Sequence, residues 1–305
     1  MPFAEPTEKK PVITILGDVR EVIKTIPDNT FQCCVTSPPY WGVRDYGIVG
    51  QIGAEPCLPD YIAELVSVFR EVRRVLKPSG TFWLNIGNTF TSGGRTWRQS
   101  DAKNKGRAMS YRPDTPEGLK KKDLIGVAWM LALACQNDGW YLRNDIIWNK
   151  PNCQPESVKD RLTVGHEYIF LMTKSERYEF DQKAIQEPVM NGAGYKNKRS
   201  VWDINTEPFP DAHFAVFPRA LVRPCILAGS KPGDLVLDPF FGSGTVGEVC
   251  QELGRLTVGI EMKPDYVEIA IRRNSKSIQT ALFTLPPAPK MSTLPKPGKR
   301  VSSSV

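Results

Sequence analysis

The sequence has few of the residues that bind metals or form disulfides. Its 305 residues include two histidines and seven cysteines, and no C-x-x-C pair occurs. An odd number of scattered cysteines predicts reduced thiols that lie mostly in a core. Two histidines without paired thiols are too few ligands for a zinc site, so we expect a protein that binds no metal.

Long apolar runs are also missing. No stretch of the chain approaches the length of a membrane span or has the pattern of a signal peptide. With 41% hydrophobic and 24% charged residues, a chain of this length can bury one substantial core. We therefore expect a cytoplasmic globular protein of enzyme size without membrane contact.

Runs of apolar residues predict strands that alternate with helices. The expected strands are 12–16, 31–35, 81–86, 140–148, 168–173, 234–238 and 256–260. The expected helices are 19–26, 62–76, 124–135 and 246–253, with Asp60 as the cap of the second helix and Pro78-Ser79-Gly80 as its end. Such alternation is typical of an α/β fold with parallel crossovers.

The central feature is Ser37-Pro38-Pro39-Tyr40, here named the proline turn, which follows the strand predicted at 31–35. Proline gives no N–H to a sheet, so the chain leaves the sheet here and its carbonyl oxygens become free acceptors. Ser37 adds a hydroxyl and Tyr40 an aromatic face. This combination suits a flat base with an amino group; a simple strand-ending turn with a packed Tyr40 is the alternative.

Two acceptors at such an amine would make it a better nucleophile. The lone pair of an exocyclic amine on cytosine or adenine is delocalised into the ring. Acceptors that hold both amine hydrogens favour the pyramidal form and free that pair for attack on an electrophilic methyl group. No covalent intermediate with the protein is needed.

A second informative stretch is Pro239-Phe240-Phe241-Gly242-Ser243-Gly244-Thr245, here named the glycine turn. It joins a short strand that ends at Asp238 to a helix, so the backbone can approach a ligand at a helix N-terminus. The next strand ends in Glu261, close to the offset of ~20 residues at which an acid binds ribose hydroxyls. The Walker lysine motif is absent, and we expect a nucleoside without pyrophosphate, such as S-adenosylmethionine.

The charge of the chain is unevenly distributed. Forty Lys and Arg against 33 Asp and Glu give a net charge of +7, which favours a polyanionic partner. Segment 89–122 holds nine basic and three acidic residues, with Trp97 and Tyr111 interleaved among them. A long basic loop of this kind suits phosphate contact, although a solvated loop is the alternative. Segment 182–205 is a second polar stretch. The candidate DNA contacts are Arg95, Arg98, Lys103, Lys105, Arg107, Arg112, Lys196 and Arg199.

Taken together, the proline turn, the glycine turn and Glu261 resemble the beta class of DNA amino-methyltransferases, found in restriction-modification systems and in solitary or phage-borne relatives. In this class the catalytic (D/N/S)-P-P-(Y/F/W) motif precedes the cofactor motif, as it does here. The resemblance implies a Rossmann-like methyltransferase fold with permuted motif order. Its sheet would have seven mostly parallel strands, one of them reversed, with helices on both faces.

The resemblance also implies roles for individual residues. Ser37, Pro38, Pro39 and Tyr40 would be catalytic. The cofactor contacts would be Asp18, Phe217, Asp238, Pro239, Phe240, Gly242, Ser243, Gly244, Thr245 and Glu261. From the residues alone, Asp18 serves equally well as a helix cap or as a ligand contact.

The domain division follows. We expect a flexible N-terminus at 1–11, a catalytic domain at 12–274 and a disordered basic tail, rich in Pro, Ser and Lys, at 275–305. Segments 89–122 and 182–205 would be target-recognition insertions. Duplex DNA is the implied partner, and a cognate restriction endonuclease and a homodimer are further implied partners.

The identity of the methylated base stays open between two amines. Within the class, Ser at the first motif position is associated chiefly with N4-methylcytosine, and Asp or Asn with N6-methyladenine. We expect cytosine N4, reached by flipping the base out of the duplex, with adenine N6 as the alternative. A DNA-binding protein that has lost catalysis and an RNA methyltransferase are less favoured, and the motif order argues against the second.

Overall fold

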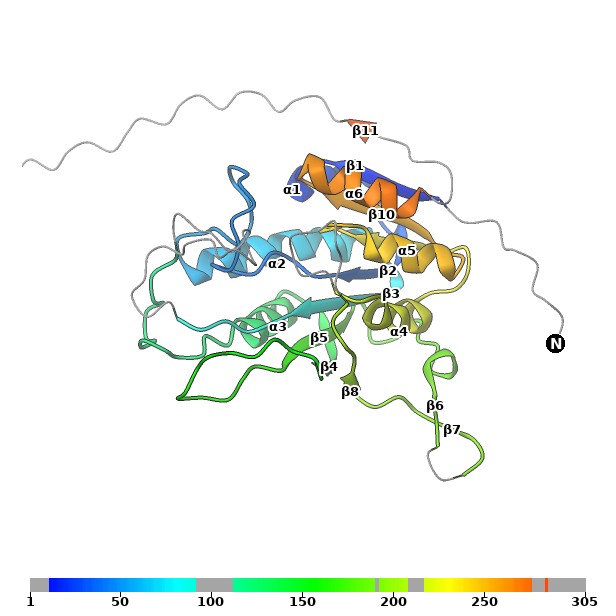
Figure 1. Ribbon diagram of the computed structural model, residues 1–305. Helices are drawn as coiled ribbons and strands as arrows, with labels where there is room; N and C mark the ends of the chain where they lie inside the picture. Colours follow the sequence, from blue (N-terminus) through cyan, green and yellow to red (C-terminus); the bar gives the residue numbers. More distant parts are fainter. Residues whose placement is uncertain (1–10, 92–111, 190–191, 208–216, 276–282, 285–305) are drawn as a thin grey trace, which may run out of the picture.

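The computed structural model describes residues 11–91, 112–189, 192–207, 217–275 and 283–284. Its main sheet has nine strands in the order β11-β1-β10-β9-β2-β3-β5-β4-β8 (Figure 1). The strands are β1 Val12–Leu16, β2 Phe31–Thr36, β3 Leu76–Ile86, β4 Tyr141–Asn149, β5 His166–Thr173, β8 Val201–Asp203, β9 Leu235–Asp238, β10 Leu256–Glu261 and β11 Phe283–Thr284. A separate hairpin pairs β6, Glu187–Pro188, with β7, Tyr195–Lys196.

The α-helices are α1 Val19–Val22, α2 Leu58–Val75, α3 Val127–Asn137, α4 Arg219–Gly229, α5 Thr245–Glu252 and α6 Pro264–Asn274. Two 3₁₀ helices are η1, Ile23–Thr25, and η3, Lys183–Ile185. Side chains of α1, α2 and α3 share one apolar core on one face of the sheet. Side chains of α4, α5 and α6 share a second core on the other face.

The sheet agrees with the predicted fold apart from its strand number. β5 runs antiparallel to both of its neighbours, β3 and β4, and every other pairing in the sheet is parallel. The two strands beyond the expected seven are the short edge strands β8 and β11. Their few residues carry no long apolar run, which is why the sequence pattern did not show them.

Several predicted boundaries differ from the structure. α2 begins at Leu58, with Cys57 as its N-cap, so Asp60 lies in the first turn and not at the cap. β3 begins at Leu76 and includes Pro78-Ser79-Gly80, which were expected to end the helix as a turn. The pairing of β2 with β3 shifts register over this stretch, and such a bulge accommodates a proline inside a strand.

Two helices and one insertion also differ. Residues 19–26 form a single α-helical turn, α1, followed by η1, and the helical stretch ends at Ile26, which is extended because it precedes Pro27. Leu124 lies before α3 in a β-bridge with Phe90 and is half exposed. The end of segment 182–205 forms β8, which pairs with β4 and therefore belongs to the sheet.

The edge strand β11 comes from the segment expected to be a tail. Phe283 and Thr284 pair in parallel with Ile15 and Leu16 of β1. The remainder of residues 276–305 lies outside the described residues, as do residues 1–10, and the division into domains stays a prediction. Among the described residues, no helix combines the length and apolar character that crossing a membrane requires.

The strand order creates a switch point between β2 and β9. β2 is followed by α2 on one face, whereas β9 is followed by α5 on the other, and these two strands pair in parallel. In open α/β sheets, ligands bind outside the carboxyl ends of the strands at such a point. The proline turn follows β2 and the glycine turn follows β9, so the fold brings both turns to this position.

Candidate active site

A cavity of about 1310 Å³ opens at the carboxyl ends of the strands. Its lining includes Ser37, Pro38, Pro39 and Tyr40 of the proline turn and Pro239, Phe240, Gly242, Ser243 and Thr245 of the glycine turn. Sites for single small ligands usually occupy ~300–1,000 Å³. A cavity of this size can therefore hold a cofactor and a second, flat group side by side.

One hydrogen bond joins the strands that precede the two turns. The Thr36 hydroxyl, at the end of β2, donates to Asp238 Oδ1, at the end of β9, over 2.6 Å. Both side chains are buried, at 0% and 1% exposure. Thr36 and Asp238 are 202 positions apart in the chain, so this bond holds two distant turns directly beside each other.

The carbonyl groups of the proline turn differ in availability. The Pro39 carbonyl accepts a hydrogen bond of 2.8 Å from the buried Tyr61 hydroxyl of α2, so the expectation that both proline carbonyls are free is wrong for this one. Among the described residues, no backbone N–H donates to the Pro38 carbonyl. Tyr61 therefore fixes the turn and leaves Pro38 to face the cavity.

Tyr40 is held by groups from other strands. Its hydroxyl donates to Glu167 Oε2, in β5, over 2.8 Å. Glu167 also accepts from Asn85 Nδ2, in β3, at 3.2 Å and forms an ion pair with Lys150. All of these residues line the cavity. Burial, and next the charge of Glu167, raises the pKa of Tyr40, so its phenol stays protonated at neutral pH.

The glycine turn is held by two carboxylates, of which Asp238 is buried and Glu261 is half-buried. Asp238 Oδ1 accepts the Phe240 N–H at 3.1 Å, besides the Thr36 hydroxyl. Burial raises the pKa of Asp238 to about 7, although these two hydrogen bonds oppose the shift. Glu261 accepts the N–H groups of Gly242 and Lys263, each at 2.8 Å, and burial raises its pKa as well.

The predicted cofactor residues fall into two groups, those that line the cavity and those that lie behind the glycine turn. Glu261 lines the cavity, whereas Asp238 lies behind the glycine turn and is not in the lining. Gly244 is also outside the lining; its φ is +80°, and a Cβ there would lie 2.4 Å from Asn274 Nδ2. Asp238 and Gly244 therefore shape the turn, and the other residues of the turn face the ligand space.

Gly242, Gly244 and Gly247 have the G-x-G-x-x-G spacing of a dinucleotide-binding loop. The third glycine serves close packing in such loops. Here a Cβ on Gly247 would lie 3.0 Å from Phe241 Cζ and from Val12 Cγ1. The spacing is thus explained by close packing of α5 against the sheet. A dinucleotide and a nucleoside without pyrophosphate would both require this packing.

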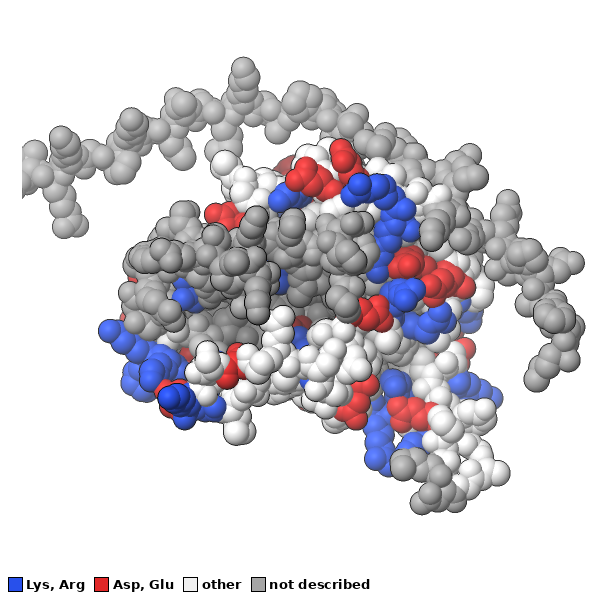
Figure 2. Space-filling view, in the orientation of Figure 1, with Lys and Arg blue, Asp and Glu red and all other residues white. Residues whose placement is uncertain are grey.

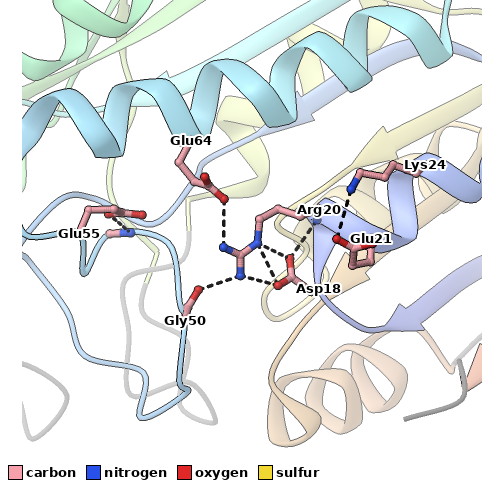
Figure 3. A network of polar contacts seen from close by, with 8 residues as sticks. Asp18, Arg20, Glu21, Lys24, Gly50, Glu55 and Glu64 are labelled. Atoms are coloured by element: carbon pink, nitrogen blue, oxygen red, sulfur yellow. Dashed lines mark hydrogen bonds and ion pairs between the residues drawn. The ribbon is translucent and has the colours of Figure 1, made fainter. Parts of the chain in front are cut away.

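Asp18 takes part in a polar network that the sequence did not reveal (Figure 3). It caps α1 by accepting the Arg20 N–H, and the Arg20 guanidinium binds both of its oxygens. Arg20 also donates to Glu64 of α2 and to the Gly50 carbonyl, at 3.0 and 2.8 Å. Arg20 thereby ties the loop that contains Gly50 to the edge of the cavity, where Asp18 is also found.

The side-chain hydroxyls of the glycine turn have a partner in α6. Arg273 donates to Ser243 Oγ and Thr245 Oγ1, at 3.1 and 3.0 Å, and pairs with Glu248 at 2.7 Å.

Phe217, which precedes α4, lines the cavity as well. The segment 208–216 just before it lies outside the described residues.

The lining fits an adenosine-containing cation. Glu261 and Asp18 provide carboxylate acceptors for hydroxyl and amino groups, and a carboxylate also favours a positively charged ligand. Phe240 and Phe217 provide apolar faces in the same cavity. This donor and acceptor set matches the chemistry of S-adenosylmethionine.

The predicted DNA contacts are only partly within the described residues. Arg95, Arg98, Lys103, Lys105 and Arg107 lie outside them, and Arg112 lines the cavity. Lys196 and Arg199 precede β8 and are not in the lining. In Figure 1 the β6–β7 hairpin lies away from the carboxyl ends of β2 and β3. Figure 2 shows the described Lys and Arg side chains in separate groups mixed with acidic ones.

Sequence reasoning missed Glu167, Lys150, Asn85 and Arg20. Asn85 lies in the strand predicted at 81–86, whereas Glu167 lies just before the strand predicted at 168–173 and Lys150 just after the one predicted at 140–148. The signal that could have found Glu167 is an acidic side chain at a strand position that faces a mostly apolar sheet. Its partners, however, come from three separate elements, so the cluster itself appears only in three dimensions.

Comparison with known sequences gives a consistent result. A family model of N6 and N4 methyltransferases, described as DNA methylase, matches residues 31–272. Type II methyltransferase M.SmaI of Serratia marcescens is 65% identical over 260 residues, which cover 85% of this chain and 89% of that protein. Type II methyltransferase M.Cfr9I of Citrobacter freundii is 57% identical over 88% of this chain and 90% of its own length.

Solved structures show the same fold. PvuII DNA methyltransferase, named as cytosine-N4-specific, has a TM-score of 0.64 at 20% identity and covers 88% of this chain and 89% of its own. TTHA0409 of Thermus thermophilus, in complex with S-adenosyl-L-methionine, has a TM-score of 0.61 at 24% identity, with 90% and 100% coverage. The predicted Rossmann-like methyltransferase fold is confirmed. The chain belongs to the N6/N4 family of DNA methylases, the S-adenosylmethionine-dependent family that the two turns predicted.

Proposed function

We propose that this protein transfers a methyl group from S-adenosylmethionine to the exocyclic N4 amine of cytosine in duplex DNA, at a specific short sequence. The observation that carries the proposal is the cavity that the proline turn and the glycine turn share, joined behind by the Thr36–Asp238 hydrogen bond. In this geometry the proposed base-amine site would lie beside the proposed cofactor site. Transfer between two bound groups depends first on such proximity.

The residues divide the work between the two sites. Glu261 and Asp18 would bind the cofactor, with Pro239, Phe240, Gly242, Ser243, Thr245 and Phe217 enclosing it. Asp238 and Gly244 would hold the turn in shape from behind. The bound cofactor supplies an electrophilic methyl group. The protein accordingly has to position an amine and shield the site from water.

The proline turn would activate the amine. Ser37 Oγ and the Pro38 carbonyl are acceptors at the cavity wall, and together they can hold both amine hydrogens. The Tyr40 ring would stack on the base after it flips out of the duplex. Since the Tyr40 hydroxyl is bound by Glu167, the ring has a fixed orientation for this stacking.

Cytosine N4 is favoured over adenine N6 by the serine of the proline turn. Ser37 stands where the adenine enzymes of the class chiefly carry Asp or Asn, and PvuII DNA methyltransferase, with a similar fold, is named cytosine-N4-specific. Adenine N6 is the alternative, because the same acceptors would serve either amine.

Mass spectrometry of nucleosides from methylated DNA tests the proposal directly. The full-length protein, duplex DNA and S-adenosylmethionine should give N4-methylcytosine. N6-methyladenine would overturn the choice of base, and DNA binding without methyl incorporation would support a protein that has lost catalysis. Incorporation into RNA but not DNA would contradict the choice of nucleic acid.

The remaining partner proposals rest on the relatives. M.SmaI and M.Cfr9I are named type II methyltransferases, which supports a cytoplasmic restriction-modification role and a cognate endonuclease for this chain. Methylated DNA should then resist cleavage by that endonuclease. Sedimentation of the purified protein would test the homodimer that the resemblance implied.

A further inference from the structure

The hydroxyl of Tyr40 lies between two other polar groups of the cavity. It donates to Glu167 Oε2 over 2.8 Å, and hydrogen bonding by the nearby Ser37 side chain opposes the rise in the pKa of Tyr40. Since the Tyr40 proton is directed to Glu167, Ser37 must act as the donor to Tyr40. The lone pairs of Ser37 Oγ then remain available to accept from a group in the cavity.

Glu167 is well placed to receive a proton. Its side chain is 20% exposed and that of its partner Lys150 is 16% exposed, so the pair lies at the wall of the cavity and not deep in the core. Lys150 Nζ binds Glu167 Oε1 and also lies 4.2 Å above the ring of Trp148.

Among the residues that the structure describes, the other groups around Glu167 are an amide and an imidazole. Asn85 of β3 donates to Glu167 Oε2 and to the Tyr168 carbonyl, and the preceding His166 packs its ring edge-on against Tyr168. The charged or titratable groups that face Glu167 are therefore Tyr40 and Lys150, with His166 next to it in the strand.

A glycine makes room for this contact. A Cβ on Gly87 would lie 3.0 Å from Glu167 Cγ and 3.1 Å from Tyr40 Cε2. The missing side chain is therefore what allows Glu167 and Tyr40 to meet.

From this arrangement we propose that Glu167 accepts the proton that the target amine loses, through the hydroxyls of Ser37 and Tyr40. The proposal rests on the proline turn as the amine site and holds for either cytosine N4 or adenine N6. It adds a residue in β5 to a reaction that the sequence had placed entirely on residues 37–40.

The step balances as follows. The amine nitrogen forms a bond to the methyl carbon, while the carbon–sulfur bond of the donor breaks and its electron pair stays on sulfur. The methylated nitrogen, now positively charged, gives one proton to Ser37 Oγ. Ser37 passes its own proton to Tyr40, and Tyr40 passes its proton to Glu167, which becomes neutral. Burial raises the pKa of Tyr40, so its hydroxyl relays a proton without persisting as a phenolate.

The two acids that hold the glycine turn are less suitable. Asp238 Oδ1 is bound by Thr36 and by the Phe240 N–H, and Asp238 does not line the cavity. Both oxygens of Glu261 accept backbone N–H groups in the glycine turn region. Only Glu167, among the three, contacts the proline turn directly.

Glu167→Gln tests the relay because the amide oxygen can still accept from Tyr40 but cannot take up a proton under these conditions. Loss of a general base typically costs about 10²–10⁴-fold, so the single-turnover methylation rate should fall by at least about 10²-fold. Cofactor and DNA dissociation constants and the fluorescence of a flipped 2-aminopurine should change by less than about threefold. The wild-type rate should fall at low pH, and this fall should be absent from the variant.

Infrared difference spectra provide a readout that is independent of rate. In the wild type, one turnover should produce the band of a newly protonated carboxyl group, and Glu167→Gln should lack it. Tyr40→Phe keeps the ring and the Glu167–Lys150 pair but removes the relay, so it should also lose the band. This variant replaces Glu167→Gln if the latter does not fold, as judged by thermal unfolding.

Two outcomes would overturn the relay. One is a Glu167→Gln variant with the rate and pH profile of the wild type, which would show that Glu167 only orients Tyr40. The other is a carboxyl band that persists in both variants. In each case the wild type still methylates DNA, so the proposed function survives; failure of the wild type to incorporate methyl would instead contradict both proposals.

Discussion

The proline turn and the glycine turn both follow a buried parallel strand and line one cavity, yet their backbone groups are used differently. The proline turn presents acceptors, namely a hydroxyl and a carbonyl, at the position proposed for an amine. The glycine turn is shaped by carboxylates that bind its backbone N–H groups. Prolines suit the first task because they remove donors, and glycines suit the second because they admit close approach.

The comparison also shows how differently the two turns are supported. The proline turn is fixed by distant side chains, Tyr61 from α2 and Glu167 from β5. The glycine turn is fixed by residues of its own βαβ unit, Asp238 and Glu261, and by Arg273 of the next helix. Substitutions in the two turns should therefore separate chemistry from cofactor binding and stability.

Ser37→Ala and Tyr40→Ala should have the largest effect. Removing one group that stabilises the transition state costs about 10²–10³-fold, or about 3–4 kcal/mol in activation free energy, so methyl transfer should nearly vanish. Cofactor affinity, measured by calorimetry, should stay within about twofold because the glycine turn is untouched. Normal turnover in either variant would contradict the assignment of the catalytic site.

Asp238→Asn should remove a pH dependence of folding. The pKa of Asp238 is about 7 in the folded protein, against about 3.9 in an unfolded chain. Between these values the folded state holds a proton that the unfolded state has lost, so wild-type stability falls as pH rises from about 4 to 7 and then levels off. About three pKa units correspond to a free-energy change on the order of 4 kcal/mol at most.

Urea unfolding at several pH values measures this effect. The asparagine variant should resemble the wild type near pH 4, where Asp238 is neutral in the folded state, and should lack the decline above it. A decline of equal size in both proteins would show that other groups cause it. Thr36→Val provides a second test, since loss of its hydroxyl should raise the pKa of Asp238 further.

Gly244→Ala should destabilise the protein by about 2–3 kcal/mol, since it combines a left-handed conformation with a clash. The φ of Gly244 is +80°, and the new Cβ would lie 2.4 Å from Asn274 Nδ2. Gly242→Ala is the matched control, because its φ is +52° but its nearest neighbour, the Phe240 carbonyl oxygen, is 4.0 Å away. Equal unfolding free energies for the two variants would show that packing behind the turn is unimportant.

Glu261→Gln should weaken cofactor binding by about tenfold. Loss of a hydrogen bond to a charged group costs roughly 1.5 kcal/mol of binding free energy. The chemical step at saturating cofactor should be little affected. Calorimetry and single-turnover rates separate these quantities. A large loss of methylation rate with unchanged cofactor affinity would show that Glu261 acts in catalysis and not in cofactor binding.

Lys196→Ala and Arg199→Ala should have the smallest effects, because both residues lie outside the cavity lining. If each contacts a phosphate, DNA affinity should fall a few-fold and the slope of log affinity against log salt should decrease by about 1. Arg112→Ala, inside the lining, should cost more. An unchanged salt slope would remove Lys196 and Arg199 from the DNA interface.

The sequence by itself determined the two turns, their order and most strand positions. Apolar runs of β-branched residues define strands such as β1 and β10, and prolines or glycines mark where each strand must end. It also identified the acid Glu261, because a βαβ unit fixes the spacing between a glycine turn and the next strand end.

Only the tertiary structure decided which groups meet. The edge strands β8 and β11 are short and need neighbours to form, and the proline inside β3 is tolerated through a register shift against β2. Tyr61 donates a hydrogen bond to the Pro39 carbonyl, and Tyr40 donates one to Glu167. In both pairs the two residues are far apart in the chain. Local patterns describe a residue's own element, whereas a hydrogen bond between elements depends on how the sheet and helices pack, which no short stretch of sequence contains.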